Sequence, residues 1–154
     1  MLALAYCGKT YTFIDSQISV AMIEKLTVEQ KSELTYLVMT MLDDWGVSNR
    51  DKITLLSLTG HIKSRAIARY YQGESVPDDP AVFERIEHLL GIADALRTSF
   101  PLNGQMAAYW LNQKNERFEN MTPLSYMLEG GDDNVIAVRA HLDCGWDWHR
   151  EESN

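Results

Sequence analysis

Apolar residues recur at intervals of three and four over most of this chain, which is the spacing that places them on one face of an α-helix. The clearest stretches cover residues 34–45 and 82–100. Their apolar positions are Leu34, Leu37, Val38, Met41, Leu42 and Trp45 in the first stretch, and Val82, Ile86, Leu89, Leu90, Ile92, Ala95, Leu96 and Phe100 in the second. We expect two long helices whose apolar faces form the core.

Polar residues and glycines mark where the first helices begin and end. Thr27 opens "TVEQ", a capping box in which the threonine hydroxyl and the glutamine side chain satisfy amides of the first turn. Gly46 is expected to end that helix, and Ser48 to cap a short second helix that stops at Gly60.

The remaining segments differ in how clearly they can be assigned. Residues 103–113 predict a helix, 115–123 a connecting loop, and Pro123 the start of a helix that ends at two glycines. A last helix is capped by Asp133 or Asn134. Residues 1–26 have no strong period, so we expect an irregular or short β extension there, without a function. Every well-defined element is helical, so the fold class is all-α.

Length and composition bound the class of protein. With 154 residues, 45% of them hydrophobic, the chain is long enough for one domain or for two small helical modules that share a core. No run approaches the roughly 18 apolar residues of a membrane span, and the opening "MLALAYCGK" lacks a basic leader. We expect a cytoplasmic protein. Cys7 and Cys144 are too few for a disulfide framework and are expected to be free, buried thiols.

Charge is distributed unevenly along the chain. The net charge is −8, yet residues 46–72 hold five basic residues and one acid, so this window carries +4 and the rest of the chain −12. Recognition of nucleic acid depends on such local patches rather than on net charge. The plain alternative is a solvated basic face with no ligand.

A short amphipathic helix within "TGHIKSRAIARYYQG" carries most of this positive charge. We expect Ser64 to be its N-cap and Gly73 its end. At 100° per residue Ile67 and Tyr70 share a sector, and Arg65 and Arg69 lie one turn apart on another. A short helix, a turn with glycine and a basic second helix is the arrangement of a helix-turn-helix. The predicted DNA contacts are Arg50, Lys52, Lys63, Ser64, Arg65 and Arg69.

The second half carries a more specific pattern. "WLNQKNERFENMTPLSYMLEGG" resembles the defining segment of the Xre/MbcA/ParS antitoxin family, with Trp110-Leu111, Asn115, Phe118, Thr122-Pro123-Leu124 and Gly130 at the positions of its motif. "SRAIARYYQG" resembles the Xre-like helix-turn-helix of the same family. The two segments stand in the family's order, and together the resemblance covers residues 34–145. Two departures stand out: Glu119-Asn120 replaces a usual glycine in the loop before Thr-Pro-Leu, and the turn "TGHIKS" is longer than usual.

The resemblance implies a division of the chain and of its function. Residues 1–26 are an extension, 27–100 an Xre-like helix-turn-helix domain, and 101–154 a toxin-binding domain. It implies an antitoxin that inhibits a RES-type toxin acting on NAD and, as a homodimer, binds its own operator DNA. The implied toxin-binding residues are Trp110, Asn115, Phe118, Pro123 and Leu124, and the aromatic tail "CGWDWHREESN" adds Trp146, Trp148 and Arg150.

Other readings stay open at this point. Trp110 and Phe118 fit a core as well as an interface, and the tail fits packing on the chain itself. The alternative function is a free-standing helix-turn-helix regulator without a toxin. A third possibility is an inhibitor whose DNA binding is weak. His141 and Cys144 lack the other ligands that zinc needs, and no nucleophile or phosphate-binding motif is present. We therefore expect no metal, no cofactor and no enzymatic activity.

Overall fold

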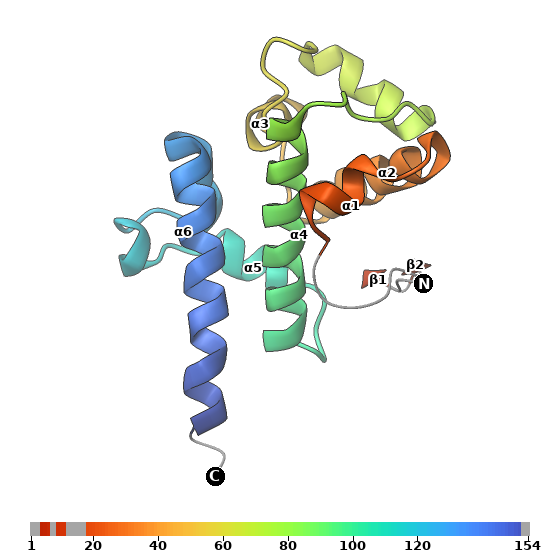
Figure 1. Ribbon diagram of the computed structural model, residues 1–154. Helices are drawn as coiled ribbons and strands as arrows, with labels where there is room; N and C mark the ends of the chain where they lie inside the picture. The colour runs from red at the N-terminus through yellow and green to blue at the C-terminus, as the bar shows by residue number, and fades with distance from the viewer. Residues whose placement is uncertain (1–3, 7–8, 12–17, 152–154) are drawn as a thin grey trace.

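The structure is a computed structural model that describes the backbone of residues 4–6, 9–11 and 18–151 and the side chains of residues 18–144. Two short antiparallel strands, β1 (Leu4–Tyr6) and β2 (Lys9–Tyr11), precede a series of helices. These are α1 (Val20–Glu24), α2 (Val28–Asp44), α3 (Asn49–Leu55), η1 (Ser64–Gln72), α4 (Pro80–Ser99), α5 (Met106–Leu111), η2 (Glu116–Phe118) and α6 (Pro123–Glu151). The predicted all-α fold class is confirmed, including the short β extension (Figure 1).

The predicted start and end of α2 and the predicted start of α3 are confirmed by their caps. The predicted end of α3 at Gly60 is wrong, because the helix ends at Leu55 and Ser57 is left-handed with φ 57°. Thr27 Oγ1 accepts from the Gln30 amide at 3.2 Å, and the Gln30 side chain accepts from the Thr27 amide at 3.0 Å. Gly46 follows α2 with φ +79°, a left-handed conformation that glycine adopts without strain. Ser48 caps α3 through the Asp51 amide at 3.1 Å. Local sequence therefore sets where both helices start and where α2 stops.

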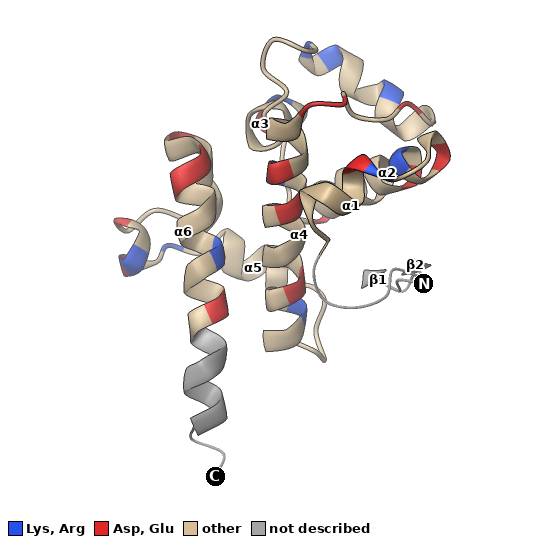
Figure 2. Cartoon of the chain, viewed as in Figure 1, with Lys and Arg blue, Asp and Glu red and all other residues tan. Residues whose placement is uncertain are grey.

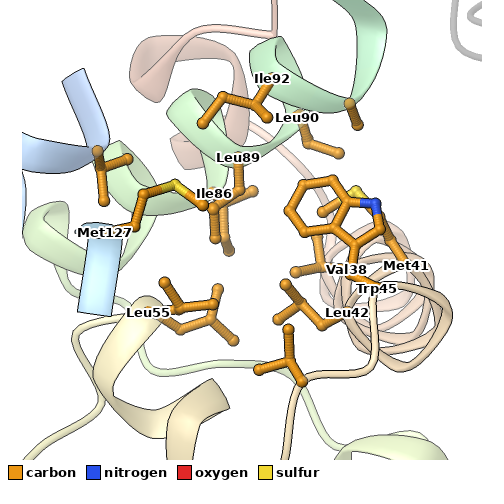
Figure 3. Close-up of a cluster of buried hydrophobic side chains, with 14 of the residues drawn as sticks. Val38, Met41, Leu42, Trp45, Leu55, Ile86, Leu89, Leu90, Ile92 and Met127 are labelled. Atoms are coloured by element: carbon orange, nitrogen blue, oxygen red, sulfur yellow. The ribbon is translucent and has the colours of Figure 1, made fainter. Parts of the chain in front are cut away.

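One hydrophobic core connects the helices. Figure 3 shows Val38 and Leu42 of α2, with Trp45 directly after this helix, facing Leu55 of α3, Ile86 and Leu89 of α4 and Met127 of α6. The helices α4 and α6 lie side by side along their length (Figure 1). The predicted boundary between residues 100 and 101 falls in the turn after α4, and the core continues across it.

The predicted extension over residues 1–26 enters the packed fold from α1 onward. Ile23 is completely buried, and the Val20 amide donates to the Glu87 carboxylate of α4 at 3.1 Å. Ser19 caps the helix by accepting from the Met22 amide. The end of this segment is therefore part of the α-helical core.

The helix α6 is broken at Gly131, whose φ of 64° and ψ of −141° lie outside helical geometry. Two helices meeting at glycines were expected here, and the break stands at that point. The predicted cap is different: Asn134 donates to the Tyr126 carbonyl at 2.7 Å, and so it satisfies the preceding half of α6 instead of the following one. Beside the break, the buried Arg85 of α4 reaches Asp132 at 2.5 Å and the Leu55 carbonyl at 3.0 Å.

The segment between η1 and α4 is held against α2. Ser32 Oγ donates to the Gly73 carbonyl at 2.8 Å, and the buried Val76 amide donates to Thr35 Oγ1 at 3.1 Å. Asp79 caps α4, where its hydrogen bond from the Ala81 amide and then its contact with His61 lower the pKa of its carboxyl. These ties fix the end of η1 relative to the core.

None of the described helices has the length and the apolar character needed to cross a membrane. Cys144 is free, but it is exposed, which corrects the expectation of a buried thiol. Cys7 lies outside the described side chains.

Candidate functional site

The candidate nucleic-acid surface lies on the corner formed by α3, the following turn and η1, residues 49–72, which we call the basic corner. Figure 2 shows blue segments on η1, the yellow-green helix of Figure 1, whereas red segments are frequent on α2 and α4. The predicted contacts Arg50, Lys63, Ser64, Arg65 and Arg69 are all exposed. The structure therefore brings five of the six predicted residues to the solvent side of the basic corner.

Three of these cations have no acidic partner among residues whose side chains are described: Arg50, Lys63 and Arg65. Arg69 Nε lies 3.4 Å from Glu74 Oε2, but both side chains are about half exposed, so this pair contributes little. Unpaired guanidinium and ammonium groups are available to an anionic ligand such as a phosphate. The basic corner can therefore accept an anionic polymer without first breaking an internal ion pair, except at Arg69.

The form of η1 differs from the prediction. It is a 3₁₀-helix over nine residues, its N-cap is Lys63 rather than Ser64, and no side chain caps its amides. At three residues per turn, positions three apart are aligned, which explains why Ile67 and Tyr70 are both buried against α2 and α3. Arg65 and Arg69 are then about 120° apart around the axis, against about 40° in an α-helix. The two arginines consequently do not share one face.

Lys52 is placed differently from the other predicted contacts. It is 1% exposed, and its ammonium group donates to Asp43, to Asn49 Oδ1 at 3.1 Å and to the Tyr71 hydroxyl at 2.9 Å. Burial alone would lower the pKa of Lys52, but the hydrogen bonds to Asp43 and Tyr71 and the charge of Asp43 outweigh it and raise the pKa. Lys52 is therefore a buried structural cation, which corrects its assignment as a DNA contact.

The motif of the second half forms a closed loop between α5 and α6. The Asn115 amide donates to the Met121 carbonyl at 3.0 Å, and the Asn115 side chain accepts from the Arg117 amide at 3.0 Å. Glu119 and Asn120 are both left-handed, with φ of 56° and 61°. The expected turn without glycine is therefore present. Asparagine tolerates this conformation better than glutamate does, because its side chain bonds locally.

The apolar motif residues point into the fold. Phe118 is 3% exposed, and Pro123 and Leu124 are buried where Pro123 opens α6. This corrects the assignment of these three residues as partner contacts, because a buried side chain offers no area to a second protein. Trp110 and Asn115 are partly buried, and Asn115 serves as the cap of η2.

Four rings form an aromatic cluster around Phe118. Its ring lies 5.2 Å from Tyr126, 5.3 Å from His141 and 6.2 Å from Trp110, and Trp110 stacks on His141 with 13° between the ring planes. Burial, followed by the charge of Arg117, lowers the pKa of His141. The imidazole is thus favoured as a neutral ring within the stack. The described residues hold no group of three or more His, Cys, Asp and Glu side chains suited to a metal ion.

Comparison with known proteins identifies a related protein. The chain is 33% identical over 102 residues to "Uncharacterized protein y4oB" of Sinorhizobium fredii (strain NBRC 101917 / NGR234), a match that covers 66% of this chain and 75% of that protein. The chain belongs to the y4oB family. The printed name of y4oB states no activity. No protein-family model matches the chain, and no solved structure does.

Two exposed residues of α5 and α6 that sequence reasoning missed are further surface candidates in this member of the y4oB family. Tyr109 of α5 is 58% exposed and Ile136 of α6 is 45% exposed, although both are large and apolar in part. Tyr109 stands next to Trp110 in the sequence, so its exposure depends on which side of a six-residue helix faces the core. Trp146, Trp148 and Arg150 lie outside the described side chains.

Proposed function

We propose that the protein is the antitoxin of a type II toxin–antitoxin system, a cytoplasmic homodimer that binds and inhibits a RES-type NAD-targeting toxin and represses its own operon by binding operator DNA. The observation that carries the DNA-binding part is a set of outward cations on the basic corner, Arg50, Lys63 and Arg65, which pair with no acid among the described side chains of a chain of net charge −8. An acidic remainder does not favour DNA elsewhere on the surface.

The toxin-binding part rests on the resemblance of the α5–α6 segment to the Xre/MbcA/ParS motif. Since Phe118, Pro123 and Leu124 are buried, the proposed contacts are exposed residues of α5 and α6, above all Tyr109. A half-exposed tyrosine offers a large apolar area with a polar tip, which is the character of interface anchors.

The first test is co-purification of the tagged full chain from its own operon, with the bound protein identified by mass. We expect a stoichiometric neighbour that stops growth when expressed alone and is harmless with this chain. A chain that purifies alone, with only transcription altered in its absence, would instead favour the free-standing regulator. Tyr109→Ala should weaken capture of the toxin while leaving the unfolding midpoint unchanged.

The second test measures binding to the DNA that directly precedes the operon. The double variant Arg65→Ala/Arg69→Ala should lose about 1–3 kcal/mol per base contact and lower the salt dependence of binding. Arg97→Ala is the matched control, because Arg97 is a half-exposed arginine on α4 outside the basic corner. If the double variant binds as the wild type does, DNA repression is abandoned and inhibition of the toxin becomes the sole proposed activity.

A further inference from the structure

A closed polar network joins three elements at the base of the basic corner. Asp43 lies in the last turn of α2, Lys52 in α3 and Tyr71 in η1. Lys52 Nζ donates to Asp43 Oδ1 and, at 2.9 Å, to the Tyr71 hydroxyl, while that hydroxyl donates to Asp43 Oδ2 at 2.5 Å. Each of the three side chains thus contacts both of the others.

The network satisfies the buried ammonium completely. An ammonium group has three donors, and Lys52 has three acceptors in Asp43, Asn49 and Tyr71. A charge removed from water is stable only when its donors are paired, so the network tolerates little displacement of any partner. Because Tyr71 is the one member on η1, its hydroxyl links η1 to α2 and α3 by polar contacts, in addition to the apolar contacts of Ile67 and Tyr70.

The ring of Tyr71 is held separately from its hydroxyl. It meets Tyr36 of α2 edge-on, with 6.3 Å between ring centroids, and Lys52 Nζ lies 5.5 Å from its centroid. Burial and the hydrogen bond to Asp43 raise the pKa of Tyr71, so the hydroxyl keeps its proton at neutral pH. Removing the hydroxyl therefore leaves the ring packing in place and breaks only the polar link.

We propose that Tyr71 is a positioning residue that, through Lys52 and Asp43, fixes the rotation of η1 and hence the directions of Arg65 and Arg69. The proposal rests on the proposed function where it concerns DNA, but its structural part does not. Arg65 and Arg69 follow the rotation of η1 because they are exposed and are held by no residue of α2 or α3 among the described side chains. Tyr71 itself is not proposed to touch DNA.

The test compares Tyr71→Phe with Tyr36→Phe in the full-length protein. Tyr36→Phe is the matched control, because it removes a hydroxyl from the neighbouring ring and leaves the polar network intact. Amide hydrogen exchange should become faster in η1 of Tyr71→Phe and stay unchanged in α4, whereas Tyr36→Phe should match the wild type. A purely structural loss would raise exchange in α4 as well.

Binding of the DNA that precedes the operon separates this proposal from the proposed function. Tyr71→Phe should raise Kd on the order of tenfold with the salt slope unchanged, while Arg65→Ala should lower the slope by about one. Unchanged exchange in η1 of Tyr71→Phe would overturn the positioning role whatever the DNA result. If the wild type binds no DNA but exchange in η1 still rises, the positioning role stands and the DNA-binding function fails.

Discussion

The basic corner and the module formed by α5, η2 and α6 use their recognisable residues in opposite ways. In the basic corner, five of six predicted contacts face solvent, and the exception, Lys52, is buried in a polar network. In the α5–α6 module, Phe118, Pro123 and Leu124 face inward and hold the loop that carries the motif. Residues that a family resemblance singles out can therefore lie in the core of one region and on the surface of another, and burial distinguishes the two.

The two regions are also held together by different forces. Beneath η1 lies a hydrogen-bonded cation with Ile67 and Tyr70 as apolar contacts, whereas the α5–α6 module is built on stacked rings. Polar networks depend on protonation and geometry, while ring packing depends on volume. Substitutions and changes of pH should therefore affect the stability of the basic corner and of the α5–α6 module differently.

The largest expected effect is on the aromatic cluster. Phe118→Ala should lower the free energy of unfolding by about 3–5 kcal/mol, because it empties the centre of the cluster. Tyr109→Ala, on the exposed side of α5, should change it by less than about 0.5 kcal/mol. Urea unfolding of both variants checks this. If Phe118→Ala were as stable as the wild type, the assignment of Phe118 to the core and of Tyr109 to the surface would be contradicted.

Next in size is the break in α6. Gly131→Ala should cost about 1–3 kcal/mol, because φ of 64° with ψ of −141° is a conformation nearly restricted to glycine. Ala137→Gly is the control, because it makes the reverse substitution in regular helix beyond the break. It should cost about 1 kcal/mol. Thermal unfolding measures both. A neutral Gly131→Ala would show that α6 runs straight through this position.

A gain of stability is expected in the motif loop. Glu119→Gly should raise the free energy of unfolding by about 0.5–1 kcal/mol, because the left-handed φ of 56° strains a glutamate and not a glycine. Asn120→Gly at φ 61° should gain less, because asparagine adopts this conformation more readily. Chemical denaturation of the two variants side by side provides the measurement, and a larger gain at Asn120 would contradict the explanation.

The smallest effect is the pH dependence, which should differ between the regions. Burial and the charge of Arg139 lower the pKa of His88, and burial and Arg117 lower that of His141. Between those lowered pKa values and the ordinary 6.5, the unfolded chain binds more protons, so the free energy of unfolding falls as pH falls through 6.5. The raised pKa values of Lys52 and Tyr71 act in the opposite direction, with stability lost only as pH rises above 10.

Urea midpoints at pH 7.5 and 5.5 check the acid side of this prediction. His88→Gln and His141→Gln should each reduce the difference between the two midpoints. For His88 the cause is direct, since Arg139 Nη1 lies 3.0 Å from its Nδ1, which must stay unprotonated to accept. If both variants show the same difference between the two midpoints as the wild type, the loss of stability in acid would come from the carboxylates instead.

Local signals in the sequence were sufficient for most of the fold. The capping box at Thr27, the cap at Ser48 and the apolar stripe of α4 each depend on residues within a few positions, so their helices could be predicted. The 3₁₀ form of η1 could not be predicted, because apolar residues three apart, such as Ile67 and Tyr70, suit either type of helix. The burial of Lys52 was equally hidden, since Tyr71 lies 19 residues further on.

The candidate site divides along the same line. An exposed cation such as Arg65 could be predicted from charge alone, because a basic side chain without a partner stays in water. The inward direction of Phe118 and the outward direction of Tyr109 depend on how α5 and α6 pack, which no local pattern of α5 specifies. The packing of α5 and α6 in the structure is what distinguishes the inward Phe118 from the outward Tyr109.

The 3₁₀ form of η1 also sets its length. Nine residues rising about 2.0 Å each extend about 18 Å, whereas an α-helix would need about twelve residues to cover that distance. One end is anchored at Tyr71 and Gly73, to Lys52, Asp43 and Ser32. If η1 converted into an α-helix it would shorten by about 4.5 Å, and the turn before Lys63 would have to span the difference. The element that carries Arg65 and Arg69 is thus an extended helix held by side chains at its C-terminal end.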